Sequence, residues 1–349
     1  MTGGFLFKIT AKRVQYEFNV SRKIMRITGD SATGKSELIR VLGDAGNPKT
    51  GISINCKYKC EVITDVFFKY IKEDIIIISN TIKNHSSTEF YDAMRNLLKR
   101  YDDTLFFADE DFKDIGTDEF ALFCKFTDSF FVLICRNSLG KLPYSYKEIY
   151  TIKTSGKFHS LIPKYNANDF SFLDENRNFI VEDSNAGYEF YKYFYNNVVP
   201  AEGKSKIKGM LKKSNTMVIA DGAAFGCEIE GILGTISRNN LDIRLFLPES
   251  FEYLVLDSEL FSNYGFSNGT ANAVNVITGL YFSWERYFTA FLTELTKDFE
   301  NCYSKGKLNQ CYYLPCCCKG KRKCNLVFTA KKKEAVLKKY LEPDKNKKE

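Results

Sequence analysis

The chain has 349 residues, of which 44% are hydrophobic and 15% aromatic, and it carries 50 Lys and Arg against 43 Asp and Glu. This composition excludes an intrinsically disordered chain, and no apolar run approaches the roughly 20 residues that a membrane-spanning helix requires. Eleven cysteines are scattered along the chain and follow no secretory signal. We therefore expect a cytoplasmic protein of about two domains, with reduced thiols and no membrane partner.

Three short strands open the chain and lead into a phosphate-binding pattern. The segments "FLFKITA" and "VQYEFNV" alternate between apolar and polar residues, and "KIMRITG" forms a third strand. The pattern G-x-x-x-x-G-K-S, a Walker A motif, consists of Gly29, Asp30, Ser31, Ala32, Thr33, Gly34, Lys35 and Ser36. The loop N–H groups and the following helix N-terminus face the phosphates, Lys35 reaches the β- and γ-phosphates, and Ser36 ligates magnesium. The sequence therefore predicts binding of ATP with Mg²⁺.

Another buried strand is followed by acidic residues of the kind that a P-loop needs to hold magnesium. The segment "TLFFA", residues 104–108, is followed by Asp109 and Glu110. This order is typical of a Walker B motif, in which Asp109 joins the magnesium shell and Glu110 activates water, with Asp111 as an alternative to Glu110. A strand that merely ends in a polar turn is the simpler interpretation, and the Walker A motif on the same chain disfavours it.

The next strand, residues 129–136, ends in Arg136. We expect this arginine either to sense the γ-phosphate or to lie on the surface. The sequence has neither an LSGGQ-like signature nor a second P-loop, which argues against a complete ABC ATPase and against a helicase motor. We assign residues 1–152 to a P-loop NTPase domain.

A second alternation of strands and helices spans residues 165–265. Glu182 follows the strand "NFIV", and Asp221 follows the strand "TMVIA". Acids at the carboxyl ends of neighbouring parallel strands converge on one crevice, where carboxylate oxygens can hold Mg²⁺. The simpler interpretation is that these acids cap the helices that follow them.

The order of these elements resembles a known domain. Strand-Glu182, then Gly203-Lys204, then strand-Asp221 and "PESFE" looks like a Toprim domain. Residues 5–260 as a whole are similar in order to the OLD (overcoming-lysogenization-defect) nucleases of bacteria, which join an N-terminal ATPase to a C-terminal Toprim domain. The resemblance implies that Glu182 serves as general acid/base or metal ligand and that Asp221 is the first acid of the Asp-x-Asp motif.

The chain departs from the Toprim pattern at one position, because Gly222 and Ala223 follow Asp221 and the second acid is missing. Asp183, Glu249 or Glu252 would then complete the metal site. The resemblance implies an ATP-regulated, metal-dependent nuclease of bacterial defence. The missing acid favours the alternative, a nucleotide-dependent switch or scaffold whose Toprim-like domain is inactive. A third hypothesis is that the P-loop belongs to a small-molecule kinase, but we identify no segment that would form a lid over the acceptor molecule.

Residues 270–330 form a region that we expect to be helical and rich in cysteine. The segment from Ala273 to Tyr303 reads as one long helix, in which Trp284, Phe288, Phe291, Leu295 and Phe299 recur at helical spacing and predict packing against the core or a second subunit. The cysteines at 311, 316, 317, 318 and 324 lack the paired spacing typical of zinc sites, and we favour a reduced basic loop over zinc.

The positive charge of the chain is concentrated at its end. From Lys305 to Glu349 there are 14 Lys and Arg against 4 Asp and Glu, a net charge of +10 that leaves −3 for the residues before it. We expect residues 331–349 to be a basic tail with a short helix and a frayed end. Such a tail is either solvated or in contact with a polyanion, for which we expect nucleic acid. The predicted fold is therefore α/β: a P-loop NTPase domain, a Toprim-like parallel-sheet domain and a helical basic tail.

Overall fold

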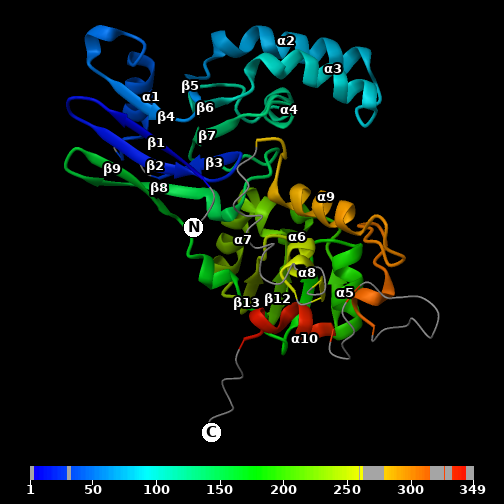
Figure 1. Ribbon diagram of the computed structural model, residues 1–349. Helices are drawn as coiled ribbons and strands as arrows, with labels where there is room; N and C mark the ends of the chain where they lie inside the picture. Colours follow the sequence, from blue (N-terminus) through cyan, green and yellow to red (C-terminus); the bar gives the residue numbers. More distant parts are fainter. Residues whose placement is uncertain are drawn as a thin grey trace. The chain divides into compact units, whose positions relative to one another are not determined.

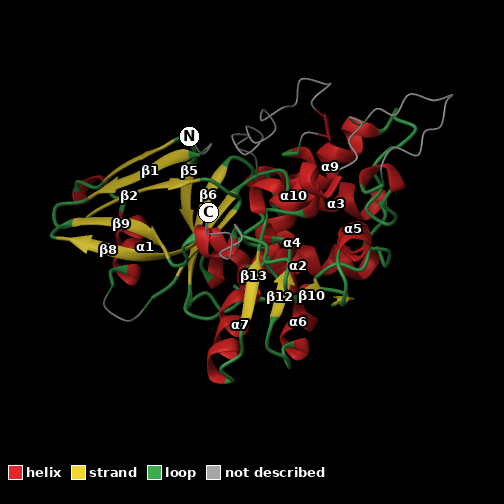
Figure 2. Cartoon of the chain, turned by 90° about the horizontal axis from the view of Figure 1, so that it is seen from below, coloured by secondary structure: helices red, strands yellow, loops and turns green. Residues whose placement is uncertain are grey.

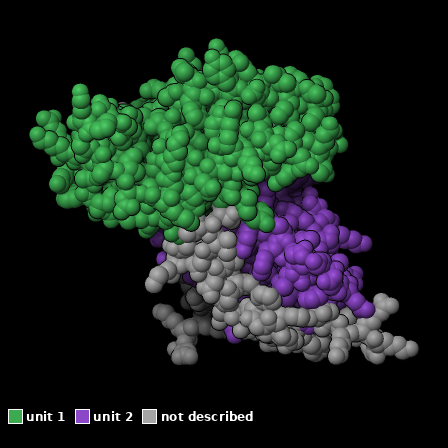
Figure 3. All heavy atoms as spheres, turned by 45° about the horizontal axis from the view of Figure 1, so that its top comes forward, with its two compact units in different colours: residues 1–165, 275–283 green, residues 166–274, 284–349 purple. Residues whose placement is uncertain are grey.

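The computed structural model describes residues 4–29, 33–258, 260–261, 279–314, 326 and 332–342. It is a mixed α/β structure that divides into two compact units (Figures 1 and 3). The first unit comprises residues 1–165 and 275–283, and the second comprises residues 166–274 and 284–349. Each unit has its own sheet and is described by itself.

The described residues of the first unit form a nine-stranded sheet in the order β4-β1-β2-β9-β8-β3-β7-β6-β5. Its strands are β1 (Phe5–Thr10), β2 (Gln15–Val20), β3 (Ile24–Ile27), β4 (Ser53–Cys56), β5 (Lys59–Val62), β6 (Thr104–Asp109), β7 (Phe130–Ile134), β8 (Ile149–Ser155) and β9 (Phe158–Pro163). The neighbours β8, β3, β7, β6 and β5 run parallel to one another. The other part is mostly antiparallel, except that β2 and β9 pair in parallel.

Helices cover both faces of the parallel part of this sheet. They are α1 (Lys35–Asp44), α2 (Asp65–Thr81), α3 (Thr88–Leu98) and α4 (Asp118–Phe126). Leu38 and Val41 of α1 share a buried core with Phe107 of β6. Phe106, which points to the opposite face, packs with its ring centroid 5.3 Å from that of Phe123 in α4, where α2, α3 and α4 lie together (Figure 1). Burial on both faces explains why β6 and β7 are continuously apolar in sequence.

The sheet of the first unit continues beyond residue 152, at which the sequence suggested the end of the first domain. The antiparallel hairpin of β8 and β9 belongs to the same sheet, and the compact unit extends to Tyr165. Residues 275–283 also belong to this unit, and Gly279 accepts a hydrogen bond from the buried ammonium of Lys23. The assignment of residues 275–283 to the first unit depends on contacts between residues that are far apart in the sequence. The local sequence gives no signal for such contacts.

The described residues of the second unit form a four-stranded, fully parallel sheet in the order β11-β10-β12-β13. Figure 2 shows β10, β12 and β13 of this sheet side by side. Its strands are β10 (Asn178–Val181), β11 (Val198–Pro200), β12 (Thr216–Ile219) and β13 (Ile243–Phe246). The helices are α5 (Ala186–Phe194), α6 (Lys204–Met210), α7 (Gly226–Arg238), α8 (Phe251–Leu256), α9 (Trp284–Thr296) and α10 (Lys332–Leu337). The alternation of strands and helices predicted for this region is therefore present.

The expected long helix is shorter than predicted, because α9 begins at Trp284 and ends at Thr296. Residues 279–283 are not helical, and part of the predicted helix, residues 273–278, lies outside the described residues. Trp284 and Phe288 are buried in the core of the second unit, and Phe291, Leu295 and Phe299 pack against that core. The aromatic stripe is thus used for packing within the unit.

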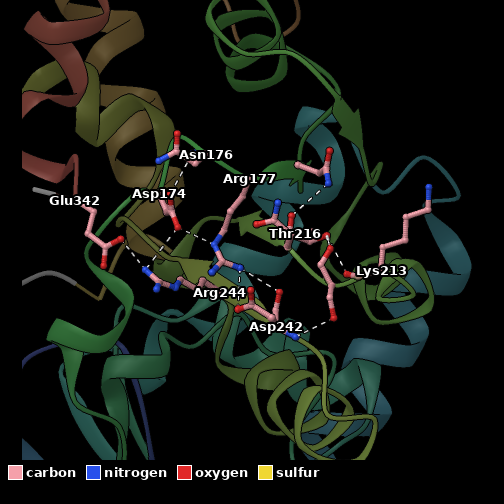
Figure 4. A network of polar contacts seen from close by, with 11 residues as sticks. Asp174, Asn176, Arg177, Lys213, Thr216, Asp242, Arg244 and Glu342 are labelled. Carbon is pink, nitrogen blue, oxygen red and sulfur yellow. Dashed lines mark hydrogen bonds and ion pairs between the residues drawn. The ribbon is translucent and has the colours of Figure 1, made fainter. Parts of the chain in front are cut away.

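The end of the chain is not a free tail in its described part. Val336 and Leu337 of α10 are buried in the core, and Leu341 forms an isolated parallel bridge with Leu173. Around this bridge Arg244 pairs with Glu342 at 2.6 Å, and a network of ion pairs continues from Arg244 to residues 174, 177 and 242 (Figure 4). Residues 332–342 are therefore held on the second unit by apolar burial and ion pairs and are not a fully solvated tail, while contact of the basic end with a polyanion stays a prediction.

The described residues contain no helix of the length and apolar character needed to cross a membrane.

Candidate functional site

The loop after β3 begins at the same level of the first unit's sheet as the acid that ends β6. Ile27 is the last residue of β3, and Asp109 is the last residue of β6. Both are aligned with Ile134 of β7, the strand between them. Two strand spacings separate them, which is about 10 Å. The start of the predicted Walker A segment and the predicted Walker B acid thus lie at the same end of these parallel strands.

Helix α1 begins differently from its neighbours. The side chains of Thr64, Ser87 and Thr117 cap α2, α3 and α4 by accepting a backbone N–H. The residue before α1 is Gly34, which has no side chain and adopts φ 91°. Any larger residue there would be strained, and its Cβ would lie 3.1 Å from the hydroxyl oxygen of Tyr16. Gly34 therefore gives no side-chain cap to the first N–H groups of α1, and a helix N-terminus is a place where backbone N–H groups can bind an anion.

Lys35, the first residue of α1, turns back over the loop. Its side chain is buried, and the ammonium donates to the carbonyl of Gly29 at 2.6 Å and to Thr33 Oγ1 at 3.1 Å. Ser36 follows it and is exposed. Asp30, Ser31 and Ala32 of the predicted loop lie outside the described residues.

Two residues that the sequence analysis did not single out support this loop. The hydroxyl of Tyr16 donates to the carbonyl of Gly34 at 2.8 Å, and its ring stacks on His159 with centroids 4.5 Å apart. Burial, followed by the negative charge of Glu37, raises the pKa of Tyr16, so its hydroxyl remains a donor. Burial lowers the pKa of His159. Tyr16 lies in β2 and His159 in β9, and only the parallel pairing of these strands brings them together.

The acids after β6 differ in their surroundings. Asp109 is partly buried, and burial raises its pKa, although the N–H of Asp111 donates to its carboxylate at 3.1 Å and opposes the shift. Glu110 and Asp111 are exposed. The carboxylate of Glu110 lies 3.4 Å from Arg136 Nε. The structure thus places Arg136, the residue proposed from sequence to sense the γ-phosphate, beside the residue proposed to activate water.

Glu182 and Asp221 come together in the second unit. They follow β10 and β12, which are neighbouring parallel strands. The backbone N–H of Asp221 donates to Glu182 Oε2 at 3.0 Å, and Asp221 Oδ1 accepts from the N–H of Phe251 at 3.2 Å. Both side chains line a cavity of about 20 Å³, which is large enough for one water molecule or ion.

Burial makes both of these carboxyl groups difficult to ionise. It raises the pKa of Glu182 to about 7, with the nearby negative charge of Glu285 adding to the effect. Burial also raises the pKa of Asp221 well above its usual range, and the charges of Glu285, Glu182 and Glu252 increase this shift. A positive charge in the cavity would relieve this cost.

The three residues considered as the missing second acid have different roles. Asp183 accepts the backbone N–H of Gly187 in the first turn of α5 at 2.9 Å, so it acts as a helix cap. Glu249 is buried at the start of the segment before α8. Glu252 is also buried and accepts the hydroxyl hydrogen of Tyr303 at 2.6 Å, while its other oxygen, Oε2, is buried and has no hydrogen-bond partner among the described residues.

Lys204 and Lys305 bring positive charge to this part of the second unit. Lys204 follows Gly203, whose φ is 120°, and its ammonium donates to the carbonyl of Ala224 at 2.7 Å. Lys305, which sequence reasoning missed, pairs with Glu285 at 2.6 Å. Burial by itself lowers the pKa of Lys305. The negative charges of Glu285, Glu252 and Asp221 outweigh this effect and raise its pKa above the usual value. No sequence motif marks Tyr303, Lys305 or Glu285.

Within the part of the chain that the structure describes, no group of three or more His, Cys, Asp or Glu side chains is arranged to hold a metal ion. Glu182, Asp221 and Glu252 therefore do not form a ready three-ligand site in this conformation. Cys311 is buried. The cysteines at 316, 317, 318 and 324 lie outside the described residues, so the choice between zinc and a reduced loop stays a prediction.

Comparison with known proteins returns no match by sequence: no protein-family model fits the chain, and no curated protein is similar to it.

Proposed function

We propose that the first unit binds ATP with Mg²⁺ and hydrolyses it. The observation that supports this proposal is that Ile27 and Asp109 both align with Ile134 of β7. This alignment brings the start of the glycine-rich loop and the acid at the end of β6 to the same end of the parallel strands. A P-loop enzyme requires this juxtaposition of a phosphate cradle and a carboxylate.

The residues of the loop fit a triphosphate. Helix α1 begins after a glycine that gives it no side-chain cap, and the ammonium of Lys35 is held over the described part of the loop by Gly29 and Thr33. When phosphate oxygens replace those two acceptors, Lys35 keeps its hydrogen bonds and gains an opposite charge. The exposed hydroxyl of Ser36 and the carboxylate of Asp109 are the oxygen ligands proposed for Mg²⁺, which would neutralise charge on the phosphates. Glu110 is the base proposed to orient the attacking water.

Binding of ATP to the Lys35→Met variant tests this proposal by calorimetry. Methionine keeps much of the buried side-chain volume but removes the ammonium, so we expect affinity to fall by at least about 100-fold, since a charge-assisted interaction is lost. The matched control is Lys12→Met, which changes an exposed lysine of the same unit. Thermal melting of both variants separates loss of binding from loss of folding. Equal ATP affinity in folded Lys35→Met and wild type would refute the P-loop assignment.

A second proposal concerns the second unit, which we infer to be a metal-dependent nuclease site. The support is the pairing of Glu182 and Asp221 beside a small cavity, with a hydrogen bond that ties one to the other and pKa values raised by burial. A divalent ion bound there would supply charge to polarise a phosphodiester and activate water. The chain's own residues would hold the carboxylates in place, through the N–H groups of Asp221 and Phe251.

The alternative, a nucleotide-dependent switch or scaffold without cutting activity, has its own support. Gly222 and Ala223 stand where a second acid would be needed, and the described residues offer no group of three metal-ligating side chains. Asp221 also accepts the N–H of Phe251 at the start of α8, which is the structural use expected of an acid that caps a helix.

A cleavage assay with isosteric variants separates the two proposals for the second unit. Supercoiled plasmid, single-stranded DNA and RNA are incubated with the protein, Mg²⁺ or Mn²⁺, and with or without ATP. We expect Glu182→Gln and Asp221→Asn to abolish cutting and to leave ATP hydrolysis intact, whereas the control Glu202→Gln, at an exposed site of the same unit, retains both activities. No cutting by wild type under any of these conditions would favour the switch or scaffold. Cutting that survives in the Glu182→Gln/Asp221→Asn protein would assign the nuclease activity to another part of the chain or to a contaminant.

A further inference from the structure

Helix α2 of the first unit presents apolar side chains to solvent. Its inner side, with Phe68, Ile71 and Ile75, is buried, and the helix lies against α3 and α4 (Figure 1). On the outer side, Val66 is 80% exposed, Tyr70 67% and Ile77 61%. Because these positions follow one another at steps of four and seven residues, they lie along one line of the helix. We call this line and the exposed residues beside it the outer stripe, which consists of Val66, Lys69, Tyr70, Glu73, Ile76 and Ile77.

The outer stripe differs from the free face of an ordinary surface helix. Such a face is polar or charged, whereas single exposed apolar residues occur on every protein and need no explanation. Here the exposed apolar side chains from Val66 to Ile77 follow one another along about 16 Å of helix, at 1.5 Å per residue. Exposed apolar side chains that gather in this way mark a surface for interaction.

The other sides of α2 fix its position within the first unit. The side chain of Thr64 caps the helix by accepting the N–H of Phe67. Asp65 accepts the backbone N–H of Lys113 at 3.0 Å, and Lys72 pairs with Asp114 at 2.6 Å. The outer stripe therefore belongs to a helix that is already formed and anchored, so that docking on it costs little ordering of the backbone.

The charges of the outer stripe fit a second copy of the same helix. Lys69 and Glu73 are exposed, lie one turn apart, and form no ion pair with another of the described residues. When two α2 helices lie antiparallel with Val66 of each opposite Ile77 of the other, Lys69 comes within one residue of the level of the other copy's Glu73. A twofold axis also brings equal flanks of the two helices together, so both such pairs of opposite charges can form.

A lipid surface fits the outer stripe less well. Helix α2 contains two lysines, Lys69 and Lys72, against three acids, Asp65, Glu73 and Asp74, so its net charge is −1. Helices that lie in a membrane interface have a polar face rich in Lys and Arg, which anionic lipids attract. The charge of α2 therefore favours a second copy of the chain over a membrane.

We propose that the outer stripe of α2 is the surface by which two copies of this chain associate, with their α2 helices antiparallel. Val66 meets Ile77 at both ends of the contact, and Lys69 meets Glu73 on one flank. One helix from each copy makes a small interface, below about 1,200 Å², so the dimer is a weak one. We expect a dissociation constant of about 10 µM. The proposal does not depend on either of the sites proposed above.

Sedimentation equilibrium of the full chain, over about 1 to 100 µM, tests the dimer. We expect Ile77→Glu to raise the dissociation constant at least about tenfold, because it places a charge in the apolar contact with Val66 of the second copy. The matched control is Ile162→Glu, at an isoleucine of β9 in the same unit that is 43% exposed, and it should dimerise as wild type does. Thermal melting shows whether both variants are folded.

Mixing two charge variants tests the antiparallel arrangement. Lys69→Glu and Glu73→Lys each bring like charges together in a dimer, so each protein alone should associate about fivefold more weakly than wild type. In a mixture of the two, opposite charges meet again, and mixed dimers should form with about the wild-type affinity. Energy transfer between donor-labelled and acceptor-labelled protein measures this association. The control is Lys99→Glu, at an exposed lysine outside α2.

Three outcomes would overturn the proposal. A wild-type protein that stays monomeric over this range refutes the dimer, and binding to phosphatidylserine vesicles that Ile77→Glu abolishes would then assign the outer stripe to a lipid surface. A dimer that Ile77→Glu leaves unchanged has its interface elsewhere on the chain. If the mixture of Lys69→Glu and Glu73→Lys associates no more tightly than either protein alone, the two α2 helices do not pair in the antiparallel arrangement.

Discussion

The hydroxyl of Tyr16 donates a hydrogen bond to the backbone carbonyl of Gly34 at 2.8 Å. This bond joins β2 to Gly34, the residue of the predicted phosphate-binding loop that immediately precedes α1. Because His159 stacks on the same ring, the position of Gly34 depends on a residue from β9 as well. The antiparallel part of the sheet thus helps to hold the loop that the parallel part presents.

The first prediction follows from that contact. Tyr16→Phe keeps the ring stacked on His159 but removes the donor to Gly34, so the loop loses one fixed point. We expect ATP affinity to fall about fivefold, since a hydrogen bond of this kind contributes about 1 kcal/mol. Calorimetric titration measures the change. The exposed Tyr70→Phe on α2 is the control, and an unchanged affinity in Tyr16→Phe would show that Gly34 is positioned without this bond.

The second prediction concerns hydrolysis of the nucleotide. Glu110→Gln should retain ATP affinity and lower the rate of hydrolysis at least about 100-fold, because an amide cannot accept a proton from water. The contact between Arg136 and Glu110, 3.4 Å, links the proposed base to the end of β7. Arg136→Gln should therefore slow hydrolysis to a smaller extent, measured as phosphate release at saturating ATP. A full rate in Glu110→Gln would transfer the role of base to another residue, with Asp111 the first to test.

The third prediction is a dependence of stability on pH. Burial raises the pKa of Glu182 from its usual 4.5 to about 7, so between these values the folded protein holds a proton that the unfolded chain has released. The free energy of unfolding therefore falls as pH rises through this window. The contribution of Glu182 is at most roughly 3 kcal/mol, from 1.36 kcal/mol per pKa unit.

Urea unfolding at several pH values between 4.5 and 7 checks this expectation. Glu182→Gln cannot ionise, so its stability should fall less steeply with pH than that of wild type. Some slope should remain because burial also raises the pKa of Asp183 and Asp221. The exposed Glu202→Gln serves as the control. An identical slope in Glu182→Gln and wild type would mean that this carboxyl ionises in the folded protein as it does in the unfolded chain.

The elements with strong local signals could be predicted from the sequence. The strands β1, β2 and β3 alternate or run apolar, the glycine spacing marks the loop before α1, and β6 ends at Asp109 as expected. The order of strands and helices in the second unit could also be predicted, because each strand there is a short apolar run followed by an acidic residue or a turn. These are features that a few consecutive residues determine.

The features that escaped prediction depend on residues far apart in the sequence. Tyr16 meets His159 only because β2 and β9 pair, and Tyr303 meets Glu252 only because the chain returns after α9. The start of α9 was misplaced because the apolar spacing before Trp284 continues into residues that are not helical, and Gly279 there accepts a hydrogen bond from Lys23 of the first unit. Periodicity reports the pattern of one segment and says nothing of its partners.

The basic end of the chain shows the same limit in its charges. Its lysines suggested a solvated tail, but Lys333 pairs with Glu175 at 2.8 Å and Lys339 with Asp257 at 3.2 Å. Removing residues 331–349 would also remove the buried Val336 and Leu337, so a truncation would test folding of the second unit as much as binding of a polyanion. A test of nucleic-acid binding must therefore leave residues 332–342 intact.

The final prediction uses substitutions at the three lysines beyond that segment, Lys345, Lys347 and Lys348. If they contact nucleic acid, replacing all three with Gln should weaken binding and flatten the dependence of the logarithm of affinity on the logarithm of salt concentration. Each lost phosphate contact should change that slope by about 0.9 on duplex DNA, because fewer counterions are released.

The control replaces three exposed lysines of the first unit, Lys12, Lys49 and Lys99. Fluorescence anisotropy with a labelled duplex at several salt concentrations measures both slopes. A slope that is equal in wild type and the triple Gln variant would show that these lysines make no phosphate contacts, and any nucleic-acid binding would then have to be sought elsewhere on the chain.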